Sequence, residues 1–285
     1  MDTLLYAIED DAVVALPVVE PMVKASSGIY QDLELGVYSA MRTFEHCKFL
    51  HLDQHLARTR QSMQRLGWRY TWNESCLRRC LDTVCDGAPF DEMRVRFDVL
   101  AAPGVARGTQ SRELISLTAF TPPEPQLYER GVSVVTTAAI RRDDPLIKAA
   151  SFVTRRHDIE ANAPQAYEHL IVDADGAILE GLSSNFYAMS RGVLYTAGDK
   201  VLEGVTRRIV LQCARELAIP VVLNAPRLDA IGQFDEAAIS SSSRGLLPVV
   251  SINRQAVARG APGPLVCALR TAYDDYVSSH IRRAV

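Results

Sequence analysis

The sequence predicts an α+β protein, in which antiparallel hairpins and separate helices replace the regular strand–helix repeat of a doubly wound sheet. Two kinds of pattern support this. Short runs of alternating apolar and polar residues meet at turn-forming residues, as around residues 173–176, and longer segments repeat apolar residues at helical spacing. In addition, three prolines among residues 121–125 resist both helix and sheet and predict a stiff connector between two domains.

The expected first domain covers residues 1–120. Its predicted elements, in chain order, are two strands within 33–52 that meet at 45–48, helices over 53–66 and 73–84, and strands over 92–100 and 114–120. We expect Asp53 and Asn73 to cap the two helices, because short polar side chains accept a hydrogen bond from the first free amides.

The expected second domain covers residues 126–285 and follows the linker at 121–125. Its predicted elements are strands over 131–139, 169–173, 177–180, 185–189 and 193–196, with helices over 151–162, 205–217 and 263–280. The turn at 173–176 and the turn at 190–192 each join two strands into a hairpin. The sequence contains no internal repeat and no low-complexity segment.

The composition favours a globular protein that binds small molecules. The 285 residues carry 31 basic and 34 acidic side chains, a net charge of −3, so no global attraction to nucleic acid is expected. The acidic start and the lack of any run of 18 apolar residues predict a cytoplasmic protein without a membrane segment. The cysteines form no C-x-x-C pair, so we expect reduced, mostly buried thiols and no metal: Cys47, Cys76, Cys80, Cys85, Cys213 and Cys267.

Lys148 is the residue whose setting most clearly suggests chemistry. Only four of the basic residues are lysines, so this chain seldom uses lysine for surface charge. Lys148 lies between an apolar pair and two alanines, where burial favours the neutral amine that imine formation requires. The alternative is a lysine at a strand end, with a packed stem and an amine in water.

Three further segments offer polar groups suited to a cofactor. Glu180 ends a strand and precedes a Gly/Ser loop, and such a carboxylate can pair with the ring nitrogen of a pyridine. Gly204 precedes a helix whose first amides form a ready phosphate site. Four serines, residues 240–243, follow a strand and could also face a phosphate. Each segment could also be an ordinary polar turn, and four serines in a row are more often only a turn.

Taken together, the order and spacing of these motifs resemble the class IV aminotransferases, the fold-type IV pyridoxal-phosphate group that includes branched-chain and D-amino acid aminotransferases and aminodeoxychorismate lyase. The resemblance covers nearly the whole chain. It rests on the segments at 36–42, 53–58, 147–148, 169–187, 202–207, 247–250 and 260–264. It implies a small N-terminal α/β domain, a larger C-terminal barrel-like domain and a homodimer.

The resemblance also implies a role for each matching residue. Lys148 corresponds to the lysine that forms the internal aldimine and moves the proton, and Glu180 to the partner of the pyridine nitrogen. The implied phosphate-binding residues are Arg58, Val205, Thr206 and Ser242. The implied substrate-side residues are Tyr38, Arg96 and Arg42. For Arg96 an alternative stays open, because the alternating pattern of the strand also allows its side chain to lie on a solvated face without a functional role.

The function implied is a transaminase that uses pyridoxal 5'-phosphate to move an amino group between an amino acid, of branched-chain or D-amino acid type, and a 2-oxo acid by a ping-pong aldimine mechanism. Two alternatives stay open. One is a lyase that eliminates pyruvate, since Ser39 lies near a position where such lyases carry a hydroxyl. The other is a homologue that binds the cofactor without turnover.

Overall fold

The computed structural model describes residues 3–18, 28–162 and 165–285. The chain divides into two compact units. The first contains Met1–Thr121, Ile147–Thr154 and His280–Val285, and the second contains Pro122–Leu146 and Arg155–Ser279. The expected domain of residues 126–285 is therefore not one continuous body. Residues 147–154 and 280–285 belong to the first unit because each segment pairs with a strand of its sheet.

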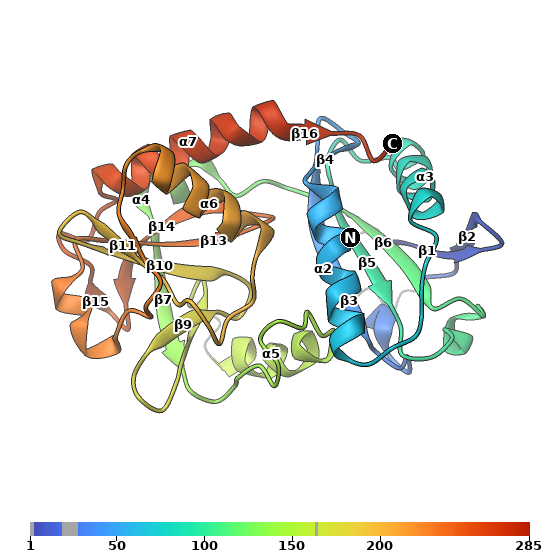
Figure 1. The fold of residues 1–285 in the computed structure, drawn as a ribbon, viewed down its shortest axis with the longest axis horizontal. Helices are drawn as coiled ribbons and strands as arrows, with labels where there is room; N and C mark the ends of the chain where they lie inside the picture. The colour runs from blue at the N-terminus through green and yellow to red at the C-terminus, as the bar shows by residue number, and fades with distance from the viewer. Residues whose placement is uncertain (1–2, 19–27, 163–164) are drawn as a thin grey trace. The chain divides into compact units, whose positions relative to one another are not determined.

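A seven-stranded sheet forms the first unit, in the order β16-β4-β3-β5-β6-β1-β2 (Figure 1). Its strands are β1 (Thr3–Glu9), β2 (Ala12–Leu16), β3 (Val37–Phe44), β4 (Lys48–Leu50), β5 (Met93–Val99), β6 (Glu113–Ala119) and β16 (Ile281–Arg282). The chain end joins this sheet because Ile281 pairs with Leu50. The segment around Lys148 joins it because Ala149 forms an antiparallel bridge with Val37.

Helices cover one face of this sheet. α2 (Leu52–Arg65) and α3 (Glu74–Asp86) share a core with the strands, in which Leu56, Leu77 and Phe97 are fully buried. Successive residues of a strand point to opposite faces, so the residues between the core positions of β3 and β5 point away from these helices. Those residues include Tyr38, Arg96 and Asp98.

The two predicted helix starts had different outcomes. Asn73 caps α3, as expected, because its side chain accepts a hydrogen bond from the amide of Cys76. The prediction for Asp53 was wrong. α2 begins one residue earlier, at Leu52, after His51 in a left-handed conformation without a side-chain cap, and Asp53 lies within the first turn.

The second unit contains a nine-stranded sheet that closes on itself. Its strands are β7 (Val132–Thr137), β8 (His169–Val172), β9 (Ile178–Gly181), β10 (Asn185–Ser190), β11 (Val193–Tyr195), β12 (Val221–Val222), β13 (Glu236–Ser241), β14 (Gly245–Ile252) and β15 (Gln255–Ala256). β9 pairs with β10 as well as with β8, which closes a ring in the order β9-β10-β13-β14-β7-β8. This ring is the barrel-like domain that the resemblance implies.

The helices α4 (Pro125–Arg130) and α6 (Val205–Glu216) belong to the second unit. α5 (Ser151–Asn162) begins in the first unit and continues into the second after Thr154, and α7 (Pro264–His280) belongs to the second unit up to Ser279. α4 departs from the sequence prediction for 121–125, because Pro125 occupies its first turn, where a missing N–H costs no hydrogen bond. Short 3₁₀ segments complete the fold at η1 (Gly28–Tyr30), η2 (Val105–Arg107) and η3 (Leu228–Gln233). Sequence analysis missed the β1–β2 hairpin and β14.

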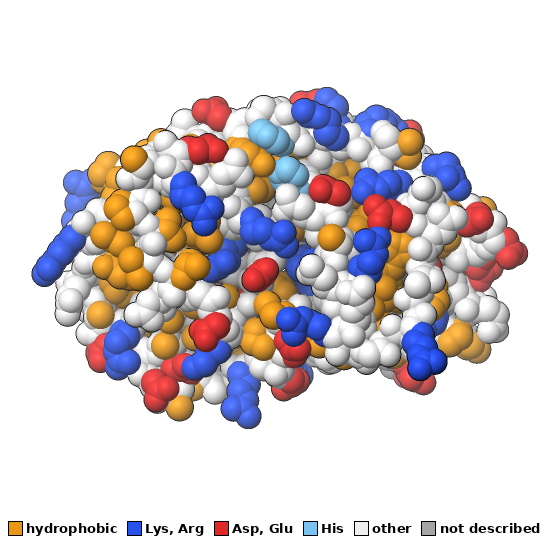
Figure 2. Space-filling view, viewed as in Figure 1, with side chains coloured by type: hydrophobic (Ala, Val, Ile, Leu, Met, Phe, Trp, Pro, Cys, Tyr) orange, Lys and Arg blue, Asp and Glu red, His pale blue; other side chains and the backbone are white. Residues whose placement is uncertain are grey.

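The surface and the cysteines agree with the composition. Charged side chains of both signs are interspersed over the face in Figure 2. All six cysteines are free thiols; five are buried and Cys267 is exposed. Within the described ranges, no helix has the length and hydropathy needed to span a bilayer.

Candidate active site

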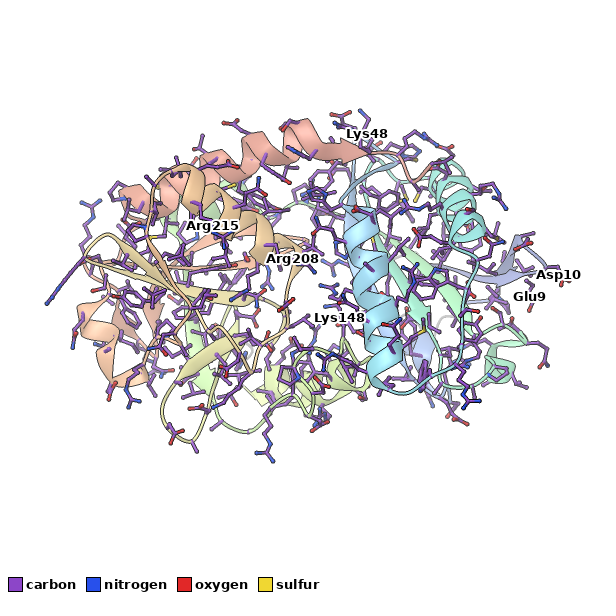
Figure 3. All side chains as sticks on the ribbon, in the orientation of Figure 1. Glu9, Asp10, Lys48, Lys148, Arg208 and Arg215 are labelled. Atoms are coloured by element: carbon purple, nitrogen blue, oxygen red, sulfur yellow. The ribbon has the colours of Figure 1, made fainter. Side chains whose placement is uncertain are left out.

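Lys148 is fixed by its backbone in the first unit. Its carbonyl accepts a hydrogen bond from the amide of Tyr38 (3.1 Å), and its own amide donates to Ser62 Oγ on α2 (3.2 Å). Figure 3 shows Lys148 alongside α2. The side chain is half-buried, and its Nζ lies 4.8 Å from the centroid of the Tyr38 ring. The amine therefore has a defined position beside an aromatic ring, which a lysine placed only for surface charge does not need.

Tyr38 also contacts Arg96. The guanidinium carbon of Arg96 lies 4.3 Å from the Tyr38 ring centroid and 4.0 Å from that of Tyr30. Arg96 donates to both carboxylate oxygens of Asp98, at 2.8 and 2.6 Å. The Arg96 side chain is 15% exposed and that of Asp98 only 1%. The alternative of a solvated face is thus wrong for Arg96, which lies in a buried ion pair.

Arg58 is buried on α2, on the other side of β3 from Tyr38. It donates from Nη2 to Ser39 Oγ (3.0 Å), and Ser39 also lies 2.9 Å from His55 Nδ1. Ser62 connects Arg58 to Lys148, since its hydroxyl donates to the Arg58 carbonyl and accepts from the Lys148 amide. Ser39, the position on which the lyase alternative depends, is thus engaged with α2.

Arg42, the third substrate-side candidate, lies further along β3. It donates to Glu92 Oε2 at 2.8 Å, and its guanidinium stacks 4.2 Å from the Phe44 ring and 4.5 Å from the Phe120 ring. These contacts give Arg42 a structural role at the end of β3 that is independent of any substrate.

Glu180 is buried in the second unit, where it pairs with Arg142. Arg142 Nε donates to Glu180 Oε1 at 2.6 Å, and the amide of Leu202 donates to Oε2 at 3.2 Å. Sequence reasoning missed Arg142. The signal available was an arginine pair six residues before Lys148, but only the fold brings Arg142 to a residue 38 positions later.

Val205 and Thr206 begin α6, as predicted. Gly204 precedes them, and a Cβ there would lie 2.4 Å from Asn185 Oδ1, so glycine is needed for the loop to approach β10. In the same first turn, Arg207 Nε is buried and has no hydrogen-bond partner among the residues that the structure describes. A helix start with free amides and an unsatisfied buried N–H forms a donor set suited to an anion.

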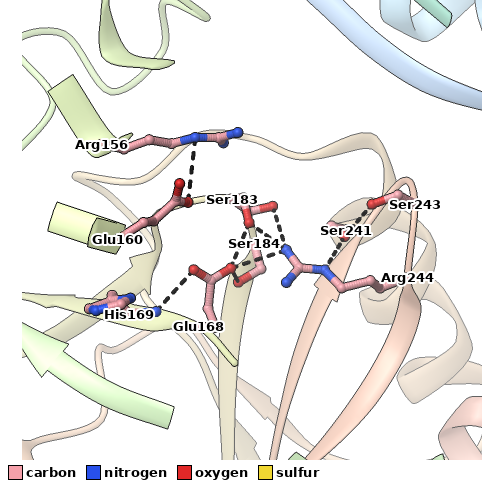
Figure 4. Close-up of polar contacts among 9 residues, drawn as sticks. All are labelled: Arg156, Glu160, Glu168, His169, Ser183, Ser184, Ser241, Ser243 and Arg244. Carbon is pink, nitrogen blue, oxygen red and sulfur yellow. Dashed lines mark hydrogen bonds and ion pairs between the residues drawn. The ribbon is translucent and has the colours of Figure 1, made fainter. Parts of the chain in front are cut away.

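Ser242 lies in the turn between β13 and β14, and a buried network holds this turn (Figure 4). Arg244 donates from Nε to Ser241 Oγ and from Nη2 to Glu168 Oε2, both at 3.0 Å. Glu168 also accepts from the hydroxyls of Ser183 and Ser184, which follow Glu180 closely in the chain. The Glu168–Arg244 pair was not predicted from the sequence.

The sheet brings the second-unit candidates to one end of the ring. Glu180 pairs with Asn185 across β9 and β10, and Asn185 pairs with Ser240 across β10 and β13. The Asn185 side chain donates to the Leu202 carbonyl, which lies just before α6. Glu180, the start of α6 and the turn with Ser242 therefore share one region. In the first unit, Lys148, Tyr38 and Arg96 form a second cluster.

A group of three potential metal ligands occurs elsewhere, at His46, Cys47 and Asp86. Burial and the hydrogen bond from its Sγ to Asp86 raise the pKa of Cys47 to about 12, which disfavours the thiolate that a metal binds. Asp86 is also paired with Arg283 at 2.6 Å. His46 Nδ1 lies 2.9 Å from the Phe90 carbonyl, so each of the three residues has a hydrogen-bond partner within the protein.

Comparisons with known proteins identify the family of this chain. The model of the amino-transferase class IV family matches residues 36–252. The D-alanine aminotransferase of Bacillus licheniformis is 29% identical over 263 residues, which cover 88% of this chain and 90% of the relative. The structure of the T.th. branched-chain amino acid aminotransferase with pyridoxamine 5'-phosphate is similar over 99% of this chain and 98% of that one, with a TM-score of 0.79 and 19% identity. The same enzyme complexed with N-(5'-phosphopyridoxyl)-L-glutamate gives a TM-score of 0.78 at 18% identity, with the same coverage.

The structural likeness shows the fold, and the family match adds the activity class. More than half of the chain lies within the family model, and the relatives compared are aminotransferases, which does not favour the lyase alternative. The chain belongs to the class IV aminotransferases.

Proposed function

We propose that this aminotransferase uses pyridoxal 5'-phosphate to move an amino group between an amino acid, of branched-chain or D-amino acid type, and a 2-oxo acid. The observation that carries the proposal is the position of Lys148, whose backbone is fixed on both sides and whose amine lies beside Tyr38. The D-alanine and branched-chain aminotransferases among the similar proteins support the substrate classes.

The donors present fit the cofactor. In the second unit, the amides of Val205 and Thr206, the Ser242 hydroxyl and the buried, unsatisfied Nε of Arg207 suit a phosphate. The resemblance also assigns a phosphate contact to Arg58, whose guanidinium would be a charged donor, and charged donors bind phosphate about twice as strongly as neutral ones. Glu180 offers a buried carboxylate that Arg142 orients through Nε.

Bound pyridoxal phosphate supplies an electron sink that stabilises negative charge on the substrate Cα. Lys148 Nζ would take the proton from the substrate Cα and pass it to the cofactor carbon that gains it in the amine form, and the half-reaction of the 2-oxo acid would run the same transfer in reverse, a task for which a primary amine is suited. Glu180 would hold a proton at the pyridine nitrogen. Tyr38 restricts the orientation of the Lys148 amine by lying 4.8 Å from it, which keeps the base on one side of the substrate.

The proposal is tested by a single half-reaction. The protein loaded with pyridoxal phosphate is mixed with L- or D-amino acids without a 2-oxo acid, and we expect the absorbance of the aldehyde form of the cofactor to fall as a 2-oxo acid appears. Lys148→Ala should abolish both changes. Lys48→Ala is the matched control, because Lys48 is an exposed lysine of the same unit that pairs with Glu45.

Borohydride reduction followed by peptide mapping locates the reactive amine. We expect the reduced pyridoxyl group on Lys148. A group on Lys24, Lys48 or Lys200 would contradict the assignment, and an unchanged spectrum with every amino acid would favour a binder without turnover. Formation of pyruvate by elimination, without loss of the aldehyde form, would favour the lyase.

A further inference from the structure

The buried pair of Arg96 and Asp98 lies one aromatic ring away from Lys148. Both residues point to the same face of β5, and Asp98 lies directly opposite Tyr38 on β3. The Tyr38 ring is within 4.3 Å of the Arg96 guanidinium and 4.8 Å of Lys148 Nζ. A substrate side chain that extends from Lys148 past Tyr38 would therefore contact this pair, and its binding would depend on the charges of the pair.

Asp98 occupies two of the donors of Arg96. Its two carboxylate oxygens accept hydrogen bonds from Nε and Nη2, which form the edge with which an arginine binds a carboxylate through two parallel hydrogen bonds. Burial alone would lower the pKa of Arg96, but Asp98 and Tyr30 raise it above its ordinary value. Arg96 is thus fully charged, and its charge is matched within the protein.

Tyr30 covers the pair and is itself fixed. Its hydroxyl lies 2.8 Å from Ser116 Oγ on β6, and its ring stacks on Arg96 at 4.0 Å. Arg107 donates to the carbonyls of Gly28, Ile29 and Gln31, on both sides of Tyr30. This bracing leaves the guanidinium little freedom to turn toward another carboxylate.

We propose that Asp98 is a specificity-determining residue, which neutralises Arg96 so that the enzyme selects substrates with one carboxylate and discriminates against a second carboxylate in the substrate side chain. This inference rests on the proposed transaminase function. A second substrate carboxylate must either displace Asp98, which leaves a buried unpaired charge, or lie beside Asp98 without a cation of its own. Without Asp98, the positive charge of Arg96 would instead favour substrates with a second carboxylate.

The test compares two acceptors in one preparation of the holoenzyme, 2-oxoglutarate and 4-methyl-2-oxopentanoate, because the ratio of their kcat/KM values does not depend on the active fraction. We expect the wild type to prefer the monocarboxylate. Asp98→Asn should shift the ratio toward 2-oxoglutarate by about tenfold or more, the size of one charged hydrogen bond. Asp98→Thr serves as a second variant if the first does not fold.

Two controls separate charge from packing. Arg96→Leu combined with Asp98→Asn should remove the gain, because no cation is then released. Glu113→Gln removes another buried carboxylate of the same sheet, which accepts a hydrogen bond from Tyr70, and should leave the ratio unchanged.

The outcomes distinguish this inference from the function on which it rests. A wild type that uses 2-oxoglutarate as well as the monocarboxylate would overturn the role of Asp98, and so would variants of Asp98 that leave the ratio unchanged. If the wild type converted neither acid and no amino acid changed the cofactor spectrum, the proposed function would fail, and this inference with it.

Discussion

The ion pair between Glu168 and Arg244 allows a quantitative test of how the second unit holds its turn at Ser242 (Figure 4). The side chains are 3% and 14% exposed. We predict that Glu168→Gln lowers the free energy of unfolding by about 3 to 5 kcal/mol, because removing one partner of a buried pair leaves the other charge uncompensated. Ser183 and Ser184 lose a charged acceptor in the same substitution.

The pH dependence follows from the pKa of Glu168. Burial alone would raise this pKa, but Arg244 and the Ser183 hydroxyl outweigh burial and hold it below the ordinary value. The unfolded chain titrates near the ordinary glutamate value of about 4.3. The stabilisation is therefore complete above that pH and is lost as the pH falls through the lower folded-state pKa. The difference between wild type and variant should be constant above about pH 5 and shrink below it.

Thermal unfolding measures the effect against a matched surface pair. Arg227 and Asp229 also lie 3.0 Å apart, but their side chains are 53% and 69% exposed. Asp229→Asn should therefore leave the Tm nearly unchanged, because water and salt screen an exposed pair. Glu168→Gln should lower the Tm by at least about 6 °C, from about 2 °C per kcal/mol for a chain of this size. A loss of Tm no larger than that of Asp229→Asn would show that burial does not strengthen the Glu168–Arg244 pair.

Two further predictions concern the cofactor and the assembly. Glu180→Gln should keep cofactor affinity but lose most of the rate of the half-reaction, since a neutral amide does not hold a proton at the pyridine nitrogen, whereas Arg58→Ala should weaken affinity by removing a charged contact with the phosphate. Fluorescence titration and stopped-flow absorbance separate the two effects, and loss of affinity alone in both variants would contradict the separate roles. From the resemblance we also predict a homodimer whose partner subunit completes the active site; a fully active species of 31.4 kDa in sedimentation would contradict it.

The features that depend on neighbouring residues could be predicted from the sequence. Helical spacing and the Asn73 cap predicted α3, and alternation predicted β5, because these patterns follow from the periods of 3.6 and 2 residues. Local chemistry also singled out Lys148, since a scarce lysine in an apolar segment stands out without knowledge of its partners. The start of α6 was predicted for the same reason, from Gly204 before an amphipathic run.

The pairing of the charged groups depends on contacts between residues that are far apart in the chain. Arg142 reaches Glu180 across 38 positions and Arg244 reaches Glu168 across 76, and no local pattern specifies such partners. Arg96 shows most clearly what a local sequence pattern does not predict. Alternation placed it on a strand face, but whether that face lies in water depends on Tyr30, Tyr38 and the segments that cover it. Burial is a property of the whole fold, and burial turns the Arg96–Asp98 pair from a surface contact into a candidate determinant of specificity.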